Sequence, residues 1–134
     1  MPEVQRTALI VDDDATIRNL LGAVMKRFGF TCDFAQDGAV ALERLGTGGS
    51  YSIILLDLMM PNVDGFGVLA EMRRRGLSSP VVVITAAGPR RINDIDLSMV
   101  AGVLTKPFEL SDLIDTVTAV CELGERGEEA NERA

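Results

Sequence analysis

Short, mainly apolar segments recur along this chain and alternate with longer amphipathic ones, and this alternation limits the possible folds more than any other feature. The apolar segments are ALIV (8–11), TCDFA (31–35), SIILL (52–56), VVVIT (81–85) and VLT (103–105). Several are apolar at every position, as in strands that are covered on both faces. We therefore predict a parallel sheet with helices on both faces, built from right-handed strand-helix-strand units.

Apolar residues at helical spacing fill the segments between and after these strands. The stripes are clearest over residues 17–28 and 110–121, and weaker over 38–45 and 64–75. Residues 90–99 form the least regular of the predicted helices, because their apolar positions are poorly spaced.

The length of 134 residues and an apolar content of 47% predict one domain with one hydrophobic core. We place this domain at residues 1–123. The last segment, GERGEEANERA (124–134), has the composition of an acidic flexible tail or linker.

The overall charge and residue content exclude several functions. A net charge of −7 argues against direct binding of this chain to nucleic acid, which requires a basic face. The chain has no histidine, so a catalyst or zinc site built on histidine is excluded. Its two cysteines lack metal-ligand spacing, and no segment resembles a signal peptide or a membrane span. We expect a cytoplasmic protein with free thiols that does not bind membranes.

Chemically active side chains follow four of the five predicted strands, and the second strand contributes nothing comparable. They are the aspartates Asp12, Asp13 and Asp14 after the first strand, Asp57 after the third, Thr85 at the end of the fourth and Lys106 after the fifth. In open parallel sheets, ligands bind beyond the carboxyl ends of the strands. We expect these side chains to meet at one edge of the sheet.

Asp13 or Asp14 could cap the following helix, but a cap accounts for only one of the three acids. Two carboxylates about 4 Å apart repel by roughly 4 kcal/mol at an effective dielectric constant of 20, so the cluster favours a bound cation. Carboxylates with waters and a carbonyl suit Mg²⁺. With a nearby ammonium, such a site would neutralise a phosphoryl group under attack by a carboxylate. Metal-assisted phosphoryl transfer to an aspartate is the chemistry we infer.

These motifs together resemble the receiver domain (CheY-like) of two-component response regulators. The resemblance covers Thr7 to about Leu123 and rests on LIVDDD, LLDLMMPNVDG, VVVITA and LTKPF, in that order and with similar separations. It implies a flavodoxin-like, doubly wound, five-stranded parallel sheet with strand order 2-1-3-4-5. It also implies phosphorelay signal transduction by a phosphoprotein that catalyses only its own phosphorylation and dephosphorylation.

The resemblance assigns a role to each of the clustered residues. Asp57 is similar to the phosphoacceptor. Asp13, Asp57 and the backbone carbonyl of Met59 are similar to the direct Mg²⁺ ligands, with Asp12 acting mainly through water. The same resemblance assigns the switch hydroxyl to Thr85, the phosphoryl-pairing ammonium to Lys106 and a cis peptide bond to Lys106-Pro107.

The chain departs from the family pattern at several positions. Val103 stands where the family often has an aromatic switch residue, so the aromatic part of the switch is missing. Met99 stands where the family tends to have a glycine, which suggests an unusual shape for residues 90–102. Met59 and Ala87 occupy the positions that orient the hydrolytic water in receivers, and neither side chain can form a hydrogen bond. We therefore expect slow self-dephosphorylation.

The sequence is also compatible with two other functions. The DDDAT segment (12–16) also resembles the D-x-D-x-T motif of haloacid-dehalogenase phosphatases, with Asp12 as nucleophile and Asp14 as acid and base. The chain could also be a receiver-like binding module that works without phosphorylation. For the receiver, the implied partners are a sensor histidine kinase or a His-phosphotransfer protein, and a downstream effector or output domain.

Overall fold

A five-stranded parallel sheet forms the centre of the computed structural model, which describes residues 6–46, 50–93, 95 and 98–133. The strands are β1 (Arg6–Val11), β2 (Phe30–Ala35), β3 (Ile53–Leu56), β4 (Val81–Thr85) and β5 (Val100–Thr105). Their order in the sheet is β2-β1-β3-β4-β5, and every neighbouring pair is parallel. The predicted strand order is confirmed, and the fold is flavodoxin-like.

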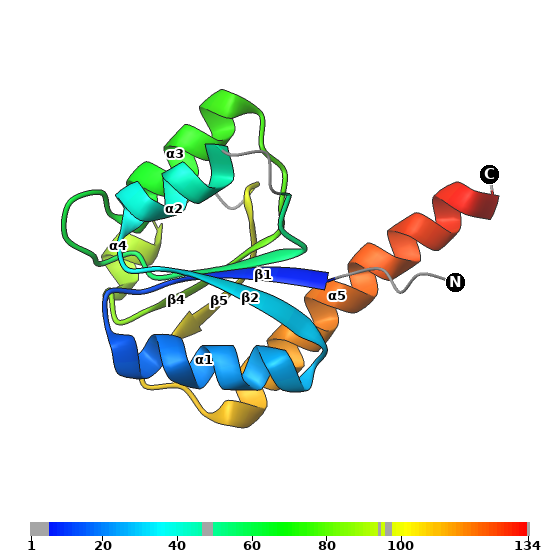
Figure 1. Cartoon of the computed structure of the whole chain (residues 1–134), viewed down its shortest axis with the longest axis horizontal. Helices are drawn as coiled ribbons and strands as arrows, with labels where there is room; N and C mark the ends of the chain where they lie inside the picture. Colours follow the sequence, from blue (N-terminus) through cyan, green and yellow to red (C-terminus); the bar gives the residue numbers. More distant parts are fainter. Residues whose placement is uncertain (1–5, 47–49, 94, 96–97, 134) are drawn as a thin grey trace.

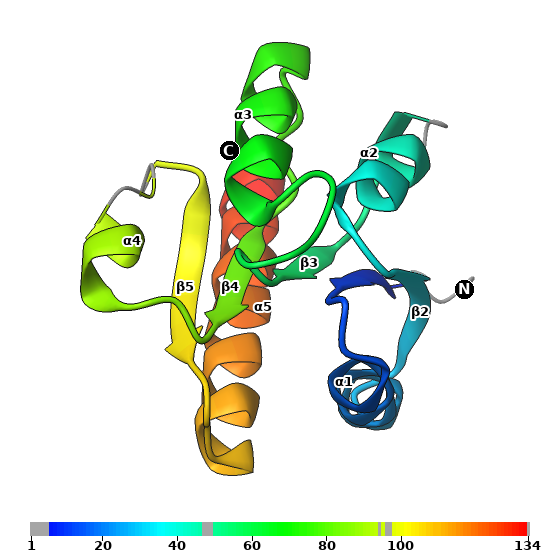
Figure 2. The ribbon, with the colours of Figure 1, turned by 90° about the vertical axis from the view of Figure 1, so that its left-hand side faces the viewer.

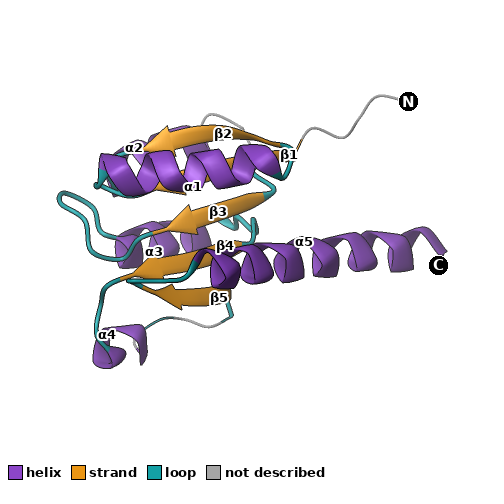
Figure 3. Cartoon of the chain, turned by 90° about the horizontal axis from the view of Figure 1, so that it is seen from below, coloured by secondary structure: helices purple, strands orange, loops and turns teal. Residues whose placement is uncertain are grey.

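Within the described residues, five helices are present, and they lie on both faces of this sheet (Figures 1 and 3). They are α1 (Ala15–Arg27), α2 (Gly38–Gly46), α3 (Gly65–Arg75), α4 (Pro89–Asn93) and α5 (Leu110–Arg133). Helices α1 and α5 lie on one face, and α2, α3 and α4 lie on the other. The predicted arrangement with helices on both faces is therefore confirmed. Within the described part of the chain, no helix is both long enough and apolar enough to cross a membrane.

Each central strand contributes side chains to two separate cores because successive residues of a strand point to opposite faces. In β3, Ile54 and Leu56 join the core under α2 and α3, whereas Ile53 and Leu55 join the core under α1 and α5. All four of these side chains are buried. This explains why the strand segments are apolar without alternation.

The side chains of two aspartates determine where the helices α1 and α3 begin. Asp14 accepts a hydrogen bond from the backbone N–H of Thr16, and Asp64 accepts one from that of Gly67. An Asp at an N-cap satisfies a helix N–H group that has no partner inside the helix. The expectation that Asp13 or Asp14 caps the first helix is therefore met by Asp14.

The segment predicted as a helix over 90–99 is much shorter in the structure. Helix α4 ends at Asn93, and β5 begins at Val100, three residues before the predicted strand start. Ile95 is buried in the core under α2 and α3, while Leu97, one of the apolar positions behind the prediction, lies outside the described residues. The poorly spaced apolar positions cannot form one face of a longer helix, which accounts for the difference.

The segment after residue 123, predicted to be an acidic flexible tail or linker, continues the last helix as far as Arg133. The C-terminal part of this helix, α5, projects away from the sheet in Figures 1 and 3. Glu, Arg and Ala favour helix, and no proline interrupts the segment. The backbone of residues 124–133 is therefore helical, and the domain boundary at 123 stays a prediction.

Candidate functional site

The predicted site residues meet at the carboxyl ends of the strands, which face the viewer in Figure 2. Asp12 follows β1, Asp57 follows β3, Thr85 ends β4 and Lys106 follows β5. Because the strands are parallel and adjacent, their ends lie at the same edge of the sheet. Residues separated by up to 94 positions in the sequence are thereby in direct contact.

The ammonium of Lys106 lies between two buried carboxylates. Its Nζ donates to Asp12 Oδ2 at 2.7 Å and to Asp57 Oδ2 at 3.3 Å. Asp12 is 1% exposed and Asp57 is 5% exposed, so both charges are largely removed from water. A buried carboxylate needs such a partner because desolvation of an unpaired charge is costly.

Backbone N–H groups hold the other oxygens of these two carboxylates. The N–H of Asp14 donates to Asp12 Oδ1 at 2.9 Å, and the N–H of Met59 donates to Asp57 Oδ1 at 3.2 Å. Each carboxylate is therefore oriented by one backbone amide and by Lys106. This arrangement fixes the direction in which each oxygen points.

Three carboxylates at this edge could hold a metal ion together. Oxygen atoms of Asp12, Asp13 and Asp57 lie within 4.8 Å of one another, and Asp13 is exposed. Hard oxygen ligands with room for water suit Mg²⁺. The residues present therefore fit a divalent metal site.

Burial and pairing have opposite effects on the titration of this cluster. Burial raises the pKa of Asp12, although the hydrogen bond and charge of Lys106 act to lower it. Burial also acts to lower the pKa of Lys106, but the hydrogen bonds and charges of Asp12 and Asp57 outweigh it and raise that pKa. Lys106 therefore remains a cation at neutral pH.

Thr85 and the Lys106-Pro107 bond occupy their predicted places. The Thr85 side chain is fully buried, and its Oγ1 accepts a hydrogen bond from the N–H of Ala87 at 3.1 Å. The N–H of Lys106 donates to the carbonyl of Thr85 at 2.8 Å, which ties the ends of β4 and β5 together. The predicted cis peptide bond between Lys106 and Pro107 is present.

Val103 and Met99 are half-buried and pack against the core under α2 and α3. A branched aliphatic side chain in this position has no ring to swing between buried and exposed poses. Val103 therefore cannot act as an aromatic switch residue.

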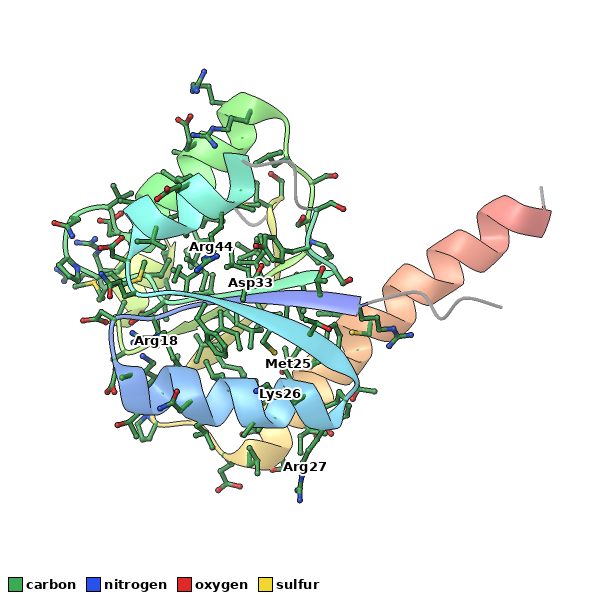
Figure 4. All side chains as sticks on the ribbon, viewed as in Figure 1. Arg18, Met25, Lys26, Arg27, Asp33 and Arg44 are labelled. Carbon is green, nitrogen blue, oxygen red and sulfur yellow. The ribbon has the colours of Figure 1, made fainter. Side chains whose placement is uncertain are left out.

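Sequence reasoning missed the contribution of Arg18 to this site. Arg18 Nη1 donates to the backbone carbonyl of Asp12 at 2.6 Å, and Figure 4 shows its side chain near the start of α1, beside the turn after β1. A basic residue in the first turn of a helix is unfavourable to the helix dipole, and this could have marked Arg18 as a residue with another role.

Sequence reasoning also missed a structural acid just after β2, the strand that was predicted to add nothing to the acid cluster. Asp37 lies there, is 6% exposed, and accepts hydrogen bonds from the N–H of Val40 and from the side-chain amide of Asn62. Those two bonds lower the pKa of Asp37. It is a buried anion that holds the loop after β3 rather than a member of the acid cluster.

A doubly wound sheet with an acid cluster and a lysine at its carboxyl edge defines a class of phosphoryl-transfer signalling domain. A profile of the response regulator receiver domain matches residues 8–118 of the chain. The chain therefore belongs to the response regulator receiver domain family, and it is homologous to response regulators of two-component systems.

Curated relatives include longer regulatory proteins. The chain is 35% identical over 108 residues to the transcriptional regulatory protein DltR of Streptococcus agalactiae, which covers 79% of this chain and 47% of DltR. It is 34% identical over 119 residues to the transcriptional regulatory protein TcrA of Mycobacterium tuberculosis, covering 87% of this chain and 46% of TcrA. The chain thus spans about half the length of these relatives.

Solved structures show the same fold. A CheY-like receiver domain protein from Methanospirillum hungatei superposes with a TM-score of 0.77 and 30% identity, covering 90% of this chain and 97% of that one. The response regulator TrrA of Thermotoga maritima, in complex with Mg²⁺-BeF, superposes with a TM-score of 0.76 and 27% identity, covering 87% and 99%.

Proposed function

We propose that Asp57 accepts a phosphoryl group in the presence of Mg²⁺, and that the modified chain changes its binding to a partner protein. The observation that carries this proposal is the buried carboxylate of Asp57, oriented by Met59 N–H and held 3.3 Å from the ammonium of Lys106. Around it lie the carboxylates of Asp12 and Asp13.

The transfer needs positioning and charge neutralisation more than further covalent chemistry. A carboxylate oxygen of Asp57 forms the new O–P bond while the P–N bond of the donor phosphohistidine breaks. The imidazole leaves with the electron pair and is then protonated. Lys106 stays charged throughout and stabilises the negative phosphoryl oxygens.

The acid cluster supplies the metal ligands. We propose Asp13, Asp57 and the backbone carbonyl of Met59 as direct Mg²⁺ ligands, with Asp12 acting through water. When bound, the metal neutralises negative charge that builds up on the phosphoryl group. The TrrA complex with Mg²⁺-BeF supports this choice of metal.

Thr85 is the proposed switch residue. Its hydroxyl accepts from the N–H of Ala87 in this structure, and rotation toward a phosphoryl oxygen would release that amide. The loop after β4 would then rearrange. Because Val103 offers no aromatic ring, the signal would pass through the backbone of this loop alone.

The proposed partners follow from the family. A sensor histidine kinase or His-phosphotransfer protein would supply the phosphoryl group, and a downstream effector or output domain would receive the signal. The relatives DltR and TcrA are transcriptional regulatory proteins about twice as long as the match. The free cysteines Cys32 and Cys121 suit a reducing compartment, so we propose the cytoplasm as the location.

Loss of the phosphoryl group should be slow. The Met59 side chain is 49% exposed and Ala87 is half-buried, and neither can orient a water by a hydrogen bond. We expect purified phosphoprotein to keep its label well beyond the scale of seconds. A decay assay that shows complete loss within seconds would contradict this.

The decisive experiment treats the pure protein with acetyl phosphate, with and without Mg²⁺, and traps the product with borohydride for mass spectrometry. Mg²⁺-dependent label on Asp57, absent in Asp57→Asn and retained in the matched control Asp33→Asn, is the expected result. Label on Asp12 would instead support a haloacid-dehalogenase-like phosphatase. If neither acetyl phosphate nor a phosphorylated histidine donor leaves a label, a phosphorylation-independent binding module becomes the better description.

A further inference from the structure

The turn after β2 and the loop after β3 are joined by adjacent residues on each side. Asp37 Oδ2 accepts from the side-chain amide of Asn62 at 3.0 Å, and the N–H of Gly38 donates to the carbonyl of Val63 at 2.9 Å. The other oxygen of Asp37 accepts from the N–H of Val40 at 2.9 Å, at the start of α2. The Asp37 carboxylate therefore links the start of α2 to the loop after β3.

This junction is built from residues with special backbone properties. Asn62 has a φ of 66°, a left-handed conformation that Asn tolerates better than most residues. A Cβ on Gly38 would lie 2.2 Å from the carbonyl oxygen of Val63, so only glycine permits the approach. The contact is thus a close and specific one, formed between segments 25 residues apart.

The same loop begins at the proposed phosphoacceptor. The N–H of Gly65 donates to the carbonyl of Leu58 at 3.0 Å and closes the loop on itself. At its start, the N–H of Met59 donates to Asp57 Oδ1 at 3.2 Å. Inside this closed loop, between Met59 and Gly65, the side chain of Asn62 is bonded to Asp37. The Asp37–Asn62 hydrogen bond therefore anchors the same loop whose Met59 amide orients Asp57.

We propose that Asp37 is a positioning residue for the phosphoryl site, acting through the side chain of Asn62 to fix the loop that carries the Met59 amide and carbonyl. This rests on the proposed function of Asp57. Asp37 would not touch the phosphoryl group. Its effect would be to keep the loop backbone in place for phosphoryl transfer. A small misplacement of the reacting groups lowers the rate of such a reaction strongly.

The test removes and then restores this one bond. Asn62→Gly removes the amide while keeping a residue that accepts the left-handed conformation, and it leaves the Asp37 cap of α2 intact. Asp37→Ala removes the same bond from the other side. The double variant Asp37→Asn with Asn62→Asp exchanges the two groups, so that an amide again donates to a carboxylate.

Tyr51→Phe is the matched control. Tyr51 is buried, and its hydroxyl donates to Asp33 Oδ2 at 2.7 Å, so this variant also loses one side-chain hydrogen bond. Tyr51 precedes β3 and therefore lies at the opposite end of the sheet from the site. A loss of rate that reflects only general stability would appear in this control as well.

The readout is the rate of Asp57 labelling by acetyl phosphate across donor concentrations, in saturating Mg²⁺. We expect the maximal rate to fall about tenfold in Asn62→Gly and Asp37→Ala, as for a misplaced reactive group. The exchanged double variant should recover most of this rate, and Tyr51→Phe should keep it. An unchanged rate in both single variants, or an equal loss in Tyr51→Phe, would overturn the proposal, as would failure of the double variant to recover.

A second readout separates this proposal from the proposed function. Hydrogen exchange of the Gly38 amide, which donates to Val63, should become faster in Asn62→Gly and return toward the original rate in the exchanged double variant. If the unaltered protein takes no label from acetyl phosphate or from a phosphorylated histidine donor, the proposed function fails, and the exchange rates still decide whether Asp37 anchors the loop. Unchanged Gly38 exchange would overturn the anchoring itself.

Discussion

Replacement of Lys106 by methionine should destabilise the protein and strengthen its binding of Mg²⁺. The ammonium lies 2.7 Å from Asp12 Oδ2 and 3.3 Å from Asp57 Oδ2, and its side chain is 18% exposed. Methionine has a similar length but no charge. The variant therefore leaves two buried carboxylates beside each other without a cation.

The size of the effect follows from these contacts. At an effective dielectric constant of 20, the two attractions amount to about 6 and about 5 kcal/mol before desolvation is subtracted. Removal of one partner of a buried ion pair costs about 3–5 kcal/mol in measured cases. Because Lys106 keeps some contact with water, we expect Lys106→Met to lower the free energy of unfolding by about 3 kcal/mol at neutral pH. This corresponds to a fall in Tm of roughly 10 °C for a domain of this size.

The stability loss of Lys106→Met should depend on pH, in a direction that follows from the pKa of Asp12. Burial already raises the pKa of Asp12 above its unfolded value of 3.8, and loss of the Lys106 ammonium should raise it further. A raised folded pKa gives stability that is full below the unfolded pKa and is lost as pH rises through the folded pKa. The loss of stability in Lys106→Met should therefore be large at neutral pH and should shrink on acidification toward the unfolded pKa of 3.8.

Thermal unfolding by circular dichroism, with EDTA or with Mg²⁺, measures these effects. Mg²⁺ should reduce the stability loss of Lys106→Met because it replaces the missing cation. The Kd of this variant for Mg²⁺ should be about tenfold lower than that of the unaltered protein, or about 1.4 kcal/mol. Lys26→Met is the matched control, since Lys26 is exposed near the C-terminal end of α1 (Figure 4) and should change stability by less than about 0.5 kcal/mol. Equal Tm values for the two variants, without a pH or Mg²⁺ dependence, would refute the reasoning.

The remaining predictions concern Tyr51, two glycines and the metal site. Tyr51 is the only tyrosine, and burial with the Asp33 hydrogen bond raises its pKa to about 12; ultraviolet titration should show this value, and Asp33→Asn should lower it. Since the raised pKa belongs to a buried neutral phenol, the associated stability should be lost as pH rises from about 10 to about 12. Gly65→Ala should cost about 3 kcal/mol and reduce Asp57 labelling, because the new Cβ would lie 2.4 Å from the Asp57 carbonyl oxygen. Gly88→Ala meets no atom within 4 Å and should change the denaturant midpoint little. Mg²⁺ at tenfold above its Kd should stabilise the unaltered protein by about 1.4 kcal/mol, and an absence of any shift in the unfolding midpoint would argue against the metal site.

Much of the architecture could be predicted because the relevant signals are local. A strand such as Val81–Thr85 shows its double-sided burial as an unbroken apolar run, and α1 shows its single buried face as a stripe at helical spacing. The same local reasoning failed for residues 90–99. There, the apolar positions follow no single periodicity, and α4 ends at Asn93 while β5 begins at Val100.

The candidate site could also be predicted in part from the sequence. Asp12, Asp57, Thr85 and Lys106 were predicted to meet because each directly follows or ends a strand of a parallel sheet, and the structure brings them together. Their types and positions along the chain are sufficient for that conclusion. Their individual roles in phosphoryl transfer stay proposals, to be decided by the labelling experiment.

The sequence by itself determined the strand-helix order, the two-sided burial of the sheet and the acids and lysine at its carboxyl edge. Only the tertiary structure decided that Lys106 lies closer to Asp12 than to Asp57, and that Asp37 holds the loop through Asn62. The physical reason is one of range. Periodicity and turn chemistry act between near neighbours, whereas these contacts join residues from 25 to 94 positions apart, whose distances are set by how the whole sheet twists and packs.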